Sequence, residues 1–267
     1  MSRKIALVSL IGVALCFWAV AAEEFPDADI QWILDQYKVS EPVSLIAAEG
    51  LTGWTRTGGG EIAPQSKWTN KEGKLTLEFS ERTKDFQGGD IVTAKQYTNF
   101  VLDFSWNAAR RCNSGIKYRV KDFGATGATH ARGWLGCEYQ ILDDFNRGEG
   151  ASDDGRFASA SLYFVFAPDK DAKKLNPHGE KNTGRIIVLD NRIEHWLNGK
   201  KVLQCEVGNE AWKQAIVDSK FAKAEGEGYA ERSFGFGENR TGFLLLQDHG
   251  GSITFEKIVI REIGEKR

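Results

Sequence analysis

The sequence lacks the features that mark nucleotide-dependent and nucleic-acid-binding proteins. It contains no Gly-x-Gly-x-x-Gly segment of the kind that binds dinucleotides. It also lacks an excess of positive charge, because its formal net charge at pH 7 is −2. We therefore expect no nucleic acid and no anionic membrane surface among its partners.

A confident membrane span is also missing. The apolar run at residues 5–20 is short, follows Arg3 and Lys4, and leads into a small-x-small cleavage site at Ala19-Val20-Ala21. This pattern is typical of an export signal, so we expect residues 1–22 to be a cleaved signal peptide. The mature chain would be secreted or periplasmic, without stable membrane insertion. Removal of the two basic residues moves its formal charge from −2 to −4.

Cysteine is scarce, and one of the four cysteines lies within the export signal. Cys112, Cys137 and Cys205 remain, and this odd number permits at most one disulfide. Cys112 and Cys137 lie on the apolar faces of two predicted strands, so they are the first pair to consider. Two or three buried free thiols are the alternative.

Helical patterns are few. Residues 23–41 predict a short amphipathic N-terminal helix, with Asp27 or Asp29 as a candidate cap, packed on the outside of the main domain. A second helix is predicted near residues 209–223, with Asn209 as its cap.

The rest of the chain, residues 42–265, reads as short strands separated by turns, including a predicted strand at residues 161–166. Asn198-Gly199 is the strongest hairpin signal, since both residues tolerate a positive φ. Without any alternation of strands and crossover helices, the pattern predicts an all-β fold. We expect one domain, a sandwich of two antiparallel sheets.

Two strands between residues 112 and 144 carry polar side chains on one face. With a period of two, Asn113, Lys117 and Arg119 share a face of the first strand, and Glu138 and Gln140 share a face of the second. If the apolar faces of both strands contact the core, these side chains form a polar wall. Such a wall suits a ligand rich in hydroxyl groups.

Four further residues are open to both a functional and a structural interpretation. Asp143 would pair with Glu138 in ordinary glycoside hydrolysis by two carboxylates, if a bulge turned it to the polar face. His195 shares a strand face with apolar residues, so a buried, hydrogen-bonded histidine and a general base are both open. Asp248 and His249 at a strand end could bind a divalent metal ion with Glu138, or form an ordinary turn.

Taken in order, these segments resemble the 3-keto-disaccharide hydrolase family over roughly residues 42–263. The resemblance rests on Val43-Ser-Leu, Leu51-Thr-Gly-Trp54, Asn113-Ser-Gly-Ile with Arg119, Gly136-x-Glu138-x-Gln140-Ile-Leu-Asp143, Leu162-Tyr163 with Ala167-Pro168, Glu194-His-Trp-Leu-Asn-Gly199 and Leu246-Gln-Asp-His-Gly250. It implies a concanavalin-like jelly roll. It also implies exported enzymes that act on glycosides oxidised to a ketone at sugar carbon 3. Two departures are Lys181, where the family commonly has tryptophan, and Lys117, where an apolar residue is expected.

A ketone at C3 acidifies the C2 hydrogen, so a base can remove that proton and expel the C1 substituent. Such a route needs one general base and a donor or cation for the enolate oxygen, not two paired carboxylates. The resemblance implies Glu138 or His195 as the base and Arg119 as a contact of the substrate or enolate oxygen. Further substrate contacts are expected from Asn113, Lys117, Gln140, Asp143, Tyr163 and Gln247.

The partner implied by this chemistry is a separate oxidoreductase that makes the keto sugar. Two other functions fit the same sandwich: a noncatalytic carbohydrate-binding domain, and an ordinary two-carboxylate glycoside hydrolase. Release of an aglycone from oxidised or unoxidised glycosides distinguishes all three.

Overall fold

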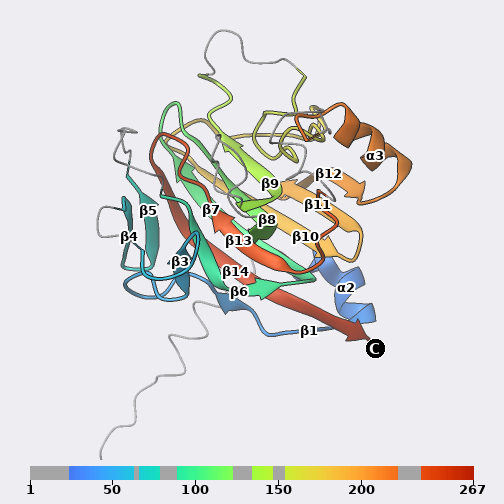
Figure 1. The fold of residues 1–267 in the computed structure, drawn as a ribbon, viewed down its shortest axis with the longest axis horizontal. Coiled ribbons are helices and arrows are strands. Elements are labelled where there is room, and N and C mark those ends of the chain that lie inside the picture. The colour runs from blue at the N-terminus through green and yellow to red at the C-terminus, as the bar shows by residue number, and fades with distance from the viewer. Residues whose placement is uncertain (1–23, 63–65, 79–88, 123–133, 147–153, 222–235) are drawn as a thin grey trace, which may run out of the picture.

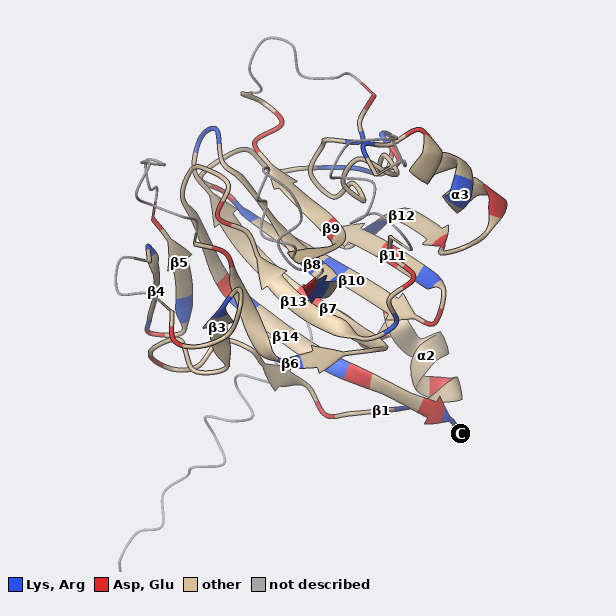
Figure 2. Cartoon of the chain, in the orientation of Figure 1, with Lys and Arg blue, Asp and Glu red and all other residues tan. Residues whose placement is uncertain are grey.

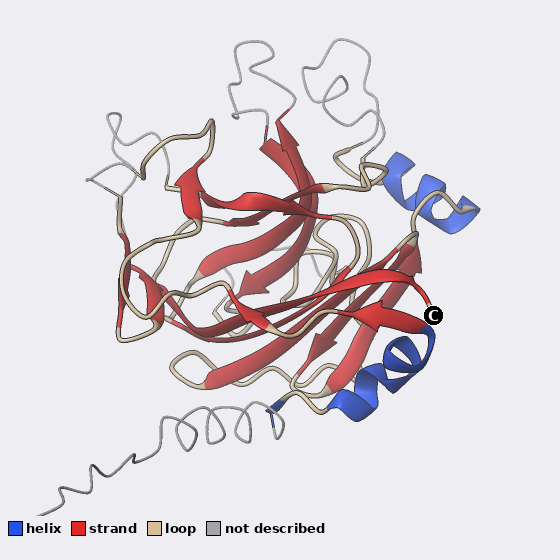
Figure 3. Cartoon of the chain, turned by 90° about the horizontal axis from the view of Figure 1, so that it is seen from below, coloured by secondary structure: helices blue, strands red, loops and turns tan. Residues whose placement is uncertain are grey.

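The computed structural model describes residues 24–62, 66–78, 89–122, 134–146, 154–221 and 236–267. The predicted signal peptide lies outside these residues. In the described chain, two antiparallel β-sheets stack face to face, with short helices at their margins (Figures 1 and 3). The predicted two-sheet, all-β sandwich is confirmed.

The larger sheet has nine strands, in the order β12-β11-β10-β7-β14-β5-β4, and β1 and β2 also pair with β14. The bounds are β1 Tyr37–Val39, β2 Val43–Ser44, β4 Trp68–Lys71, β5 Lys74–Leu77, β7 Phe100–Ala108, β10 Lys181–Leu189, β11 Arg192–Leu197, β12 Lys200–Glu206 and β14 Ile253–Lys266.

The smaller sheet has five strands, in the order β3-β6-β13-β8-β9. The bounds are β3 Trp54–Arg56, β6 Ile91–Tyr97, β8 Asn113–Asp122, β9 Trp134–Leu142 and β13 Gly242–Leu246. The two strands that carry the predicted polar wall are therefore neighbours, β8 and β9. Strand β13 pairs with the other edge of β8.

The hydrophobic core fills the space between the sheets. From β7 it receives Leu102, Phe104 and Trp106, and from β8 and β9 it receives Tyr118 and Tyr139. All five side chains are at most 1% exposed. Because side chains alternate along a strand, the intervening residues of β8 and β9 face away from this core. The polar wall is thus the outer face of the five-stranded sheet.

The N-terminal segment is less helical than the sequence predicts. It contains a 3₁₀ turn at Asp27–Ile30, the helix α2 at Gln31–Gln36, and then strand β1. No side chain caps the 3₁₀ turn, so the predicted cap by Asp27 or Asp29 is wrong. The predicted packing is correct, because Ile30 and Ile33 are buried on the outside of the nine-stranded sheet. Figure 3 shows α2 at the margin, beside the C-terminus.

The second helix and the hairpin follow the prediction. Helix α3 spans Glu210–Val217, and the Asn209 side chain accepts a hydrogen bond of 2.8 Å from the Trp212 backbone N–H. Between β11 and β12, Asn198 and Gly199 have φ values of +47° and +73°. These values explain the Asn-Gly pair, because both positions of a type I′ turn need a positive φ.

Residues 161–166 form no regular strand, so that prediction is wrong. The segment turns back on itself: Phe166 donates a backbone hydrogen bond to Leu162, and Phe164 has a φ of +67°. It nevertheless pairs with the free edge of β9, where Tyr163 N–H donates to the Glu138 carbonyl at 3.0 Å. The apolar run is explained by this pairing and by contact with the core, not by strand geometry.

The three cysteines of the described chain are free thiols. Cys112 precedes β8 and accepts a backbone hydrogen bond from Asp143, whereas Cys137 lies opposite Tyr118, at the other end of the strand pair. They are too far apart along the pair to form the disulfide that the sequence suggests first. Burial raises the pKa of both thiols to about 12.

Candidate functional site

The polar wall places four of the predicted residues on adjacent strands. In the register of β8 and β9, Lys117 lies directly opposite Glu138, and Gly115 lies opposite Gln140. Residues directly opposite each other in a sheet point to the same face. Glu138, Gln140, Lys117 and Asn113 therefore share one surface, as predicted.

Glu138 is the buried carboxylate of this surface, with 6% of its area exposed. Its side chain lies over Gly115, which leaves the room that it occupies. Burial raises the pKa of Glu138, and the positive charges of Lys117 and Lys220 partly offset that rise. A carboxylate with a raised pKa is a stronger base once it has lost its proton, which suits proton abstraction near neutral pH.

Amide groups surround the carboxylate. Gln140 Nε2 donates to Asn113 Oδ1 at 3.4 Å, and Asn113 Nδ2 lies 3.3 Å from His249 Nδ1. The side-chain amide oxygens (Oε1) of Gln140 and Gln247 are both buried and have no hydrogen-bond partner within the described chain. Each is an acceptor that a sugar hydroxyl can satisfy, and such orphaned acceptors are costly unless a ligand or water pairs with them.

The end of β13 adds the predicted Gln247, Asp248 and His249. Gln247 N–H donates to the Gly115 carbonyl at 3.1 Å, which ties this turn to the middle of the wall. Asp248 is 6% exposed, and its backbone N–H donates to Asp90 Oδ1 at 2.8 Å. Sequence reasoning missed Asp90, although its charge also contributes to the raised pKa of Glu138.

Tyr163 and Lys220 close the β9 side of the wall. Lys220 Nζ lies 4.3 Å from the centroid of the Tyr163 ring, and its charge interacts with that of Glu138. The backbone of Tyr163 pairs with β9 at Glu138, and its predicted contact with the substrate stays a prediction. Lys220 has no motif around it in the sequence, and only the fold brings it from the end of α3 to this surface.

Arg119 does not belong to the wall. A bulge between Tyr118 and Lys121 interrupts the pairing of β8 and β9, and Arg119 has a φ of +54°. Its guanidinium donates to the backbone carbonyls of Gly237 and Asp190 instead. The prediction that Arg119 shares the polar face with Glu138 is wrong, because the bulge breaks the alternation on which it rests, and the structure gives no support to Arg119 as a substrate contact.

His195 lies in the core rather than in the wall. Its Nδ1 donates to the Ala160 carbonyl at 3.0 Å, and its Nε2 accepts from the Tyr118 hydroxyl at 2.8 Å. The ring is 0% exposed, and burial lowers its pKa to about 4. Of the two interpretations, the structure places His195 as the buried, hydrogen-bonded histidine, away from Glu138.

Asp143 holds a turn together. Its carboxylate accepts from the Arg111 backbone N–H at 2.7 Å, from Asn146 Nδ2 at 2.9 Å and from the Phe145 N–H at 3.2 Å. With these bonds made and 5% of its area exposed, the carboxylate serves the loop after β9. The structure therefore does not aim it at a substrate or pair it with Glu138.

A metal site at Asp248, His249 and Glu138 is not formed. In the described ranges, no group of three or more His, Cys, Asp or Glu side chains is arranged to hold a metal ion. His249 instead lies against Asn113.

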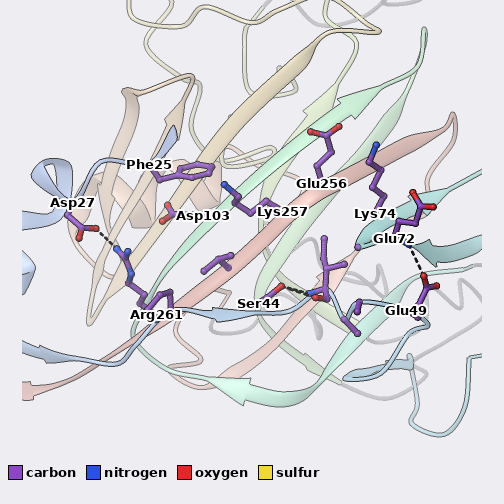
Figure 4. Close-up of a pocket in the computed structure, with 16 residues that line it drawn as sticks. Phe25, Asp27, Ser44, Glu49, Glu72, Lys74, Asp103, Glu256, Lys257 and Arg261 are labelled. Carbon is purple, nitrogen blue, oxygen red and sulfur yellow. Dashed lines mark hydrogen bonds and ion pairs between the residues drawn. The ribbon is translucent and has the colours of Figure 1, made fainter. Parts of the chain in front are cut away.

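A cavity of about 1010 Å³ lies on the opposite face of the sandwich. It opens between the N-terminal segment and strands β5 and β14, and Figure 4 shows its mixed charges, including the ion pair between Asp27 and Arg261. None of the predicted site residues lines it. In the view of Figure 2, positions with charges of both signs are interspersed along the strands and loops.

Comparison with known proteins assigns the family. A family model described as the 3-keto-alpha-glucoside-1,2-lyase-like domain matches residues 41–261. The chain belongs to this family. It is also 30% identical over 230 residues to a 3-keto-disaccharide hydrolase of Bacteroides thetaiotaomicron, which covers 82% of this chain and 77% of that protein.

Two solved structures from Parabacteroides distasonis, both described as proposed glycosyl hydrolases, share the fold. The first has a TM-score of 0.68 and 27% identity and covers 86% of this chain and all of the other. The second has a TM-score of 0.56 and 22% identity, with 84% of this chain covered. The chain is accordingly a carbohydrate-active hydrolase. Within the described residues, no helix is both long and apolar enough to cross a membrane.

Proposed function

We propose that this chain is an exported enzyme that cleaves glycosides carrying a ketone at sugar carbon 3, with Glu138 as the general base. The observation that carries the proposal is the position of Glu138: it is a buried carboxylate with a raised pKa, it lies opposite Lys117 in the sheet, and its charge interacts with those of Lys117 and Lys220. Proton abstraction beside a ketone needs this combination of base and positive charge.

In the proposed reaction, Glu138 takes the proton from C2, and the electron pair moves to the C3 oxygen as an enolate. Return of that pair expels the aglycone from C1, and the aglycone leaves with the proton that Glu138 carries. Water then adds at C1 of the enone and gives a proton to Glu138, and Glu138 passes that proton to C2. The net result is hydrolysis of the glycosidic bond.

The other wall residues would orient the sugar. The buried amide oxygens of Gln140 and Gln247 accept from hydroxyl groups, and Lys117 lies across from the base, where a developing negative charge needs a cation. The name of the Bacteroides relative supports a 3-keto sugar as substrate. The basic and apolar pattern of residues 1–22 supports export, and a separate oxidoreductase would supply the ketone.

Asp90 favours one alternative. Its charge reaches Glu138, so these two carboxylates, rather than Glu138 and Asp143, are the pair on which ordinary glycoside hydrolysis would rest. That mechanism does not need the ketone.

The test mixes residues 23–267 with a 3-keto-glucoside and with the unoxidised glucoside and follows release of the aglycone. Release from the keto compound alone is expected, and Glu138→Gln should abolish it. Glu206→Gln, at an exposed position on β12, is the matched control and should act as wild type. Release from both compounds would instead favour ordinary hydrolysis, and binding without release would favour a carbohydrate-binding domain.

A further inference from the structure

Lys220 has surroundings that are unusual for a lysine. Its Nζ lies 4.3 Å from the ring centroid of Tyr163, 4.9 Å from that of Phe164 and 5.4 Å from that of Phe221. Most lysines extend into water, whereas this ammonium is enclosed by aromatic rings.

The charges nearby are those of the wall. Burial has the largest effect on the pKa of Lys220 and lowers it. The negative charge of Glu138 raises this pKa, and the positive charge of Lys117 lowers it. Together they lower the pKa of Lys220 to about 8. Roughly a tenth of the molecules therefore carry a neutral amine at pH 7, compared with well under a thousandth for an ordinary lysine. Desolvation and a neighbouring cation are the two means by which proteins make a lysine nucleophilic.

The Lys220 amine lies close enough to Glu138, the proposed base, for their charges to interact. Tyr163, over whose ring the amine lies, donates its backbone N–H to the backbone carbonyl of Glu138 at 3.0 Å, which brings the segment that carries this ring to the strand of the base. A ketone is the functional group with which a neutral lysine condenses.

We propose that Lys220 is a catalytic amine that forms an imine with the C3 ketone of the sugar, so that an iminium ion rather than a bare ketone acidifies the C2 proton. This inference rests on the proposed function, and it deepens it by giving the reaction a covalent intermediate.

The neutral Lys220 nitrogen adds to C3, and with one proton from solvent the C3 oxygen leaves as water to give a protonated imine; hydrolysis of the imine later returns that proton. Glu138 takes the C2 proton, the C–H electron pair becomes the C2–C3 double bond, and the C3–N π pair returns to nitrogen as an enamine. The nitrogen lone pair of the enamine then re-forms the C3–N double bond, and the C2–C3 π pair forms a C1–C2 double bond as the C1–O bond breaks. The aglycone leaves with the proton from Glu138.

Release of the product needs two molecules of water. The first molecule adds at C1 of the unsaturated iminium and gives a proton to Glu138. Glu138 then passes that proton to C2. The second hydrolyses the imine and restores the ketone and the free amine. Since imine formation released one water, the net change is hydrolysis, as in the route without the amine. Lys117 remains the cation opposite Glu138.

The first experiment treats the wild-type protein with a 3-keto-glucoside in the presence of cyanoborohydride, which reduces iminium ions in preference to ketones. We expect irreversible loss of activity that requires both reagents. The protein mass should increase by that of the keto sugar less one oxygen atom, and peptide mapping should place the sugar on Lys220. No adduct, or an adduct on Lys117 alone, overturns the inference.

The second experiment compares Lys220→Arg with Lys220→Met. An imine requires a primary amine, so both variants should lose kcat on the order of 10³-fold or more. If Lys220 acts only through its charge, Lys220→Arg keeps most of the activity, which overturns the inference. Lys213→Met, at an exposed lysine of α3, is the matched control and should release the aglycone as wild type does.

The two proposals fail in distinguishable ways. If the wild-type protein releases no aglycone from any 3-keto-glycoside, the proposed function is wrong. If it releases the aglycone but is not trapped and tolerates Lys220→Arg, the function stands and the amine role is wrong.

Discussion

Gly115 and Glu138 are fitted to each other across β8 and β9: a Cβ atom at position 115 would lie 2.5 Å from Glu138 Oε1. The backbone of Gly115 is not in the left-handed region, so glycine is needed here for space and not for φ. The same carboxylate is the base of the proposed reaction, and its position depends on the missing side chain.

Gly115→Ala should therefore move the Glu138 side chain and lower kcat/KM on the order of 10²-fold, the usual effect of misplacing a reacting group by about 1 Å. Overpacking should lower the free energy of unfolding by about 1–3 kcal/mol, which leaves the fold intact. Steady-state kinetics on a 3-keto-glucoside and urea denaturation measure the two effects.

Gly264→Ala on β14 is the control, because a Cβ there meets its nearest neighbour, the Lys38 carbonyl oxygen, at 3.4 Å. It should leave kcat/KM unchanged. Wild-type kinetics for Gly115→Ala would mean that the position of Glu138 does not matter.

Lys117→Met should change the pH dependence of the reaction. Lys117 is the cation that most lowers the pKa of Glu138 against the effect of burial. Without it that pKa rises, so a higher pH is needed to form the carboxylate, and the acidic limb of the kcat/KM profile should move to higher pH. Lys213→Met should leave the limb in place. If the acidic limb does not move in Lys117→Met, the limb reports the ionisation of a group other than Glu138.

The polar wall illustrates how far alternation along a strand can be trusted. The period of two correctly predicts that Asn113 and Lys117 share a face with Glu138 and Gln140, because β8 and β9 pair in regular register as far as Tyr118. It fails for Arg119, the residue after Tyr118, because the bulge that begins there gives β8 more residues than β9. No residue type marks that bulge, since Arg119 takes a positive φ without being glycine.

The remaining differences arise from tertiary contacts. His195 lies on the predicted face of β11, with the apolar residues. Only the hydrogen bonds to Tyr118 and Ala160 show that both of its ring nitrogens have partners in the core. Lys220 was not predictable, because α3 and the segment around Tyr163 meet only in the folded chain. Short-range patterns thus give strand faces, and the fold decides which segments cover them.

A bidentate ion pair holds the N-terminal segment to the nine-stranded sheet. Arg185 Nε and Nη2 lie 2.5 and 3.2 Å from the Asp103 carboxylate, and Nη1 donates to the Pro26 carbonyl at 3.3 Å. Both charged side chains are nearly fully buried.

Arg185→Met should lower the free energy of unfolding by about 3–5 kcal/mol, because it leaves the buried Asp103 carboxylate without a partner. The double variant Asp103→Leu/Arg185→Met should recover most of this loss, since no unpaired charge remains. Urea denaturation at pH 7 measures both. Activity per folded molecule should not change, because the pair lies on the face opposite Glu138, and a double variant as unstable as the single one would contradict the explanation.

The buried His195 should make the protein less stable in mild acid. Burial lowers its pKa to about 4 in the folded chain, from the 6.5 of a histidine exposed to water. Between these values the unfolded chain binds the proton and the folded chain does not, so stability falls as pH decreases from about 6.5 towards 4. From pH 7 to pH 5 this one group should cost about 2 kcal/mol. Urea denaturation at the two pH values, compared with His195→Gln, isolates the contribution: the variant should lose that much less stability on acidification, and an equal loss in both proteins would mean that His195 is already protonated in the fold.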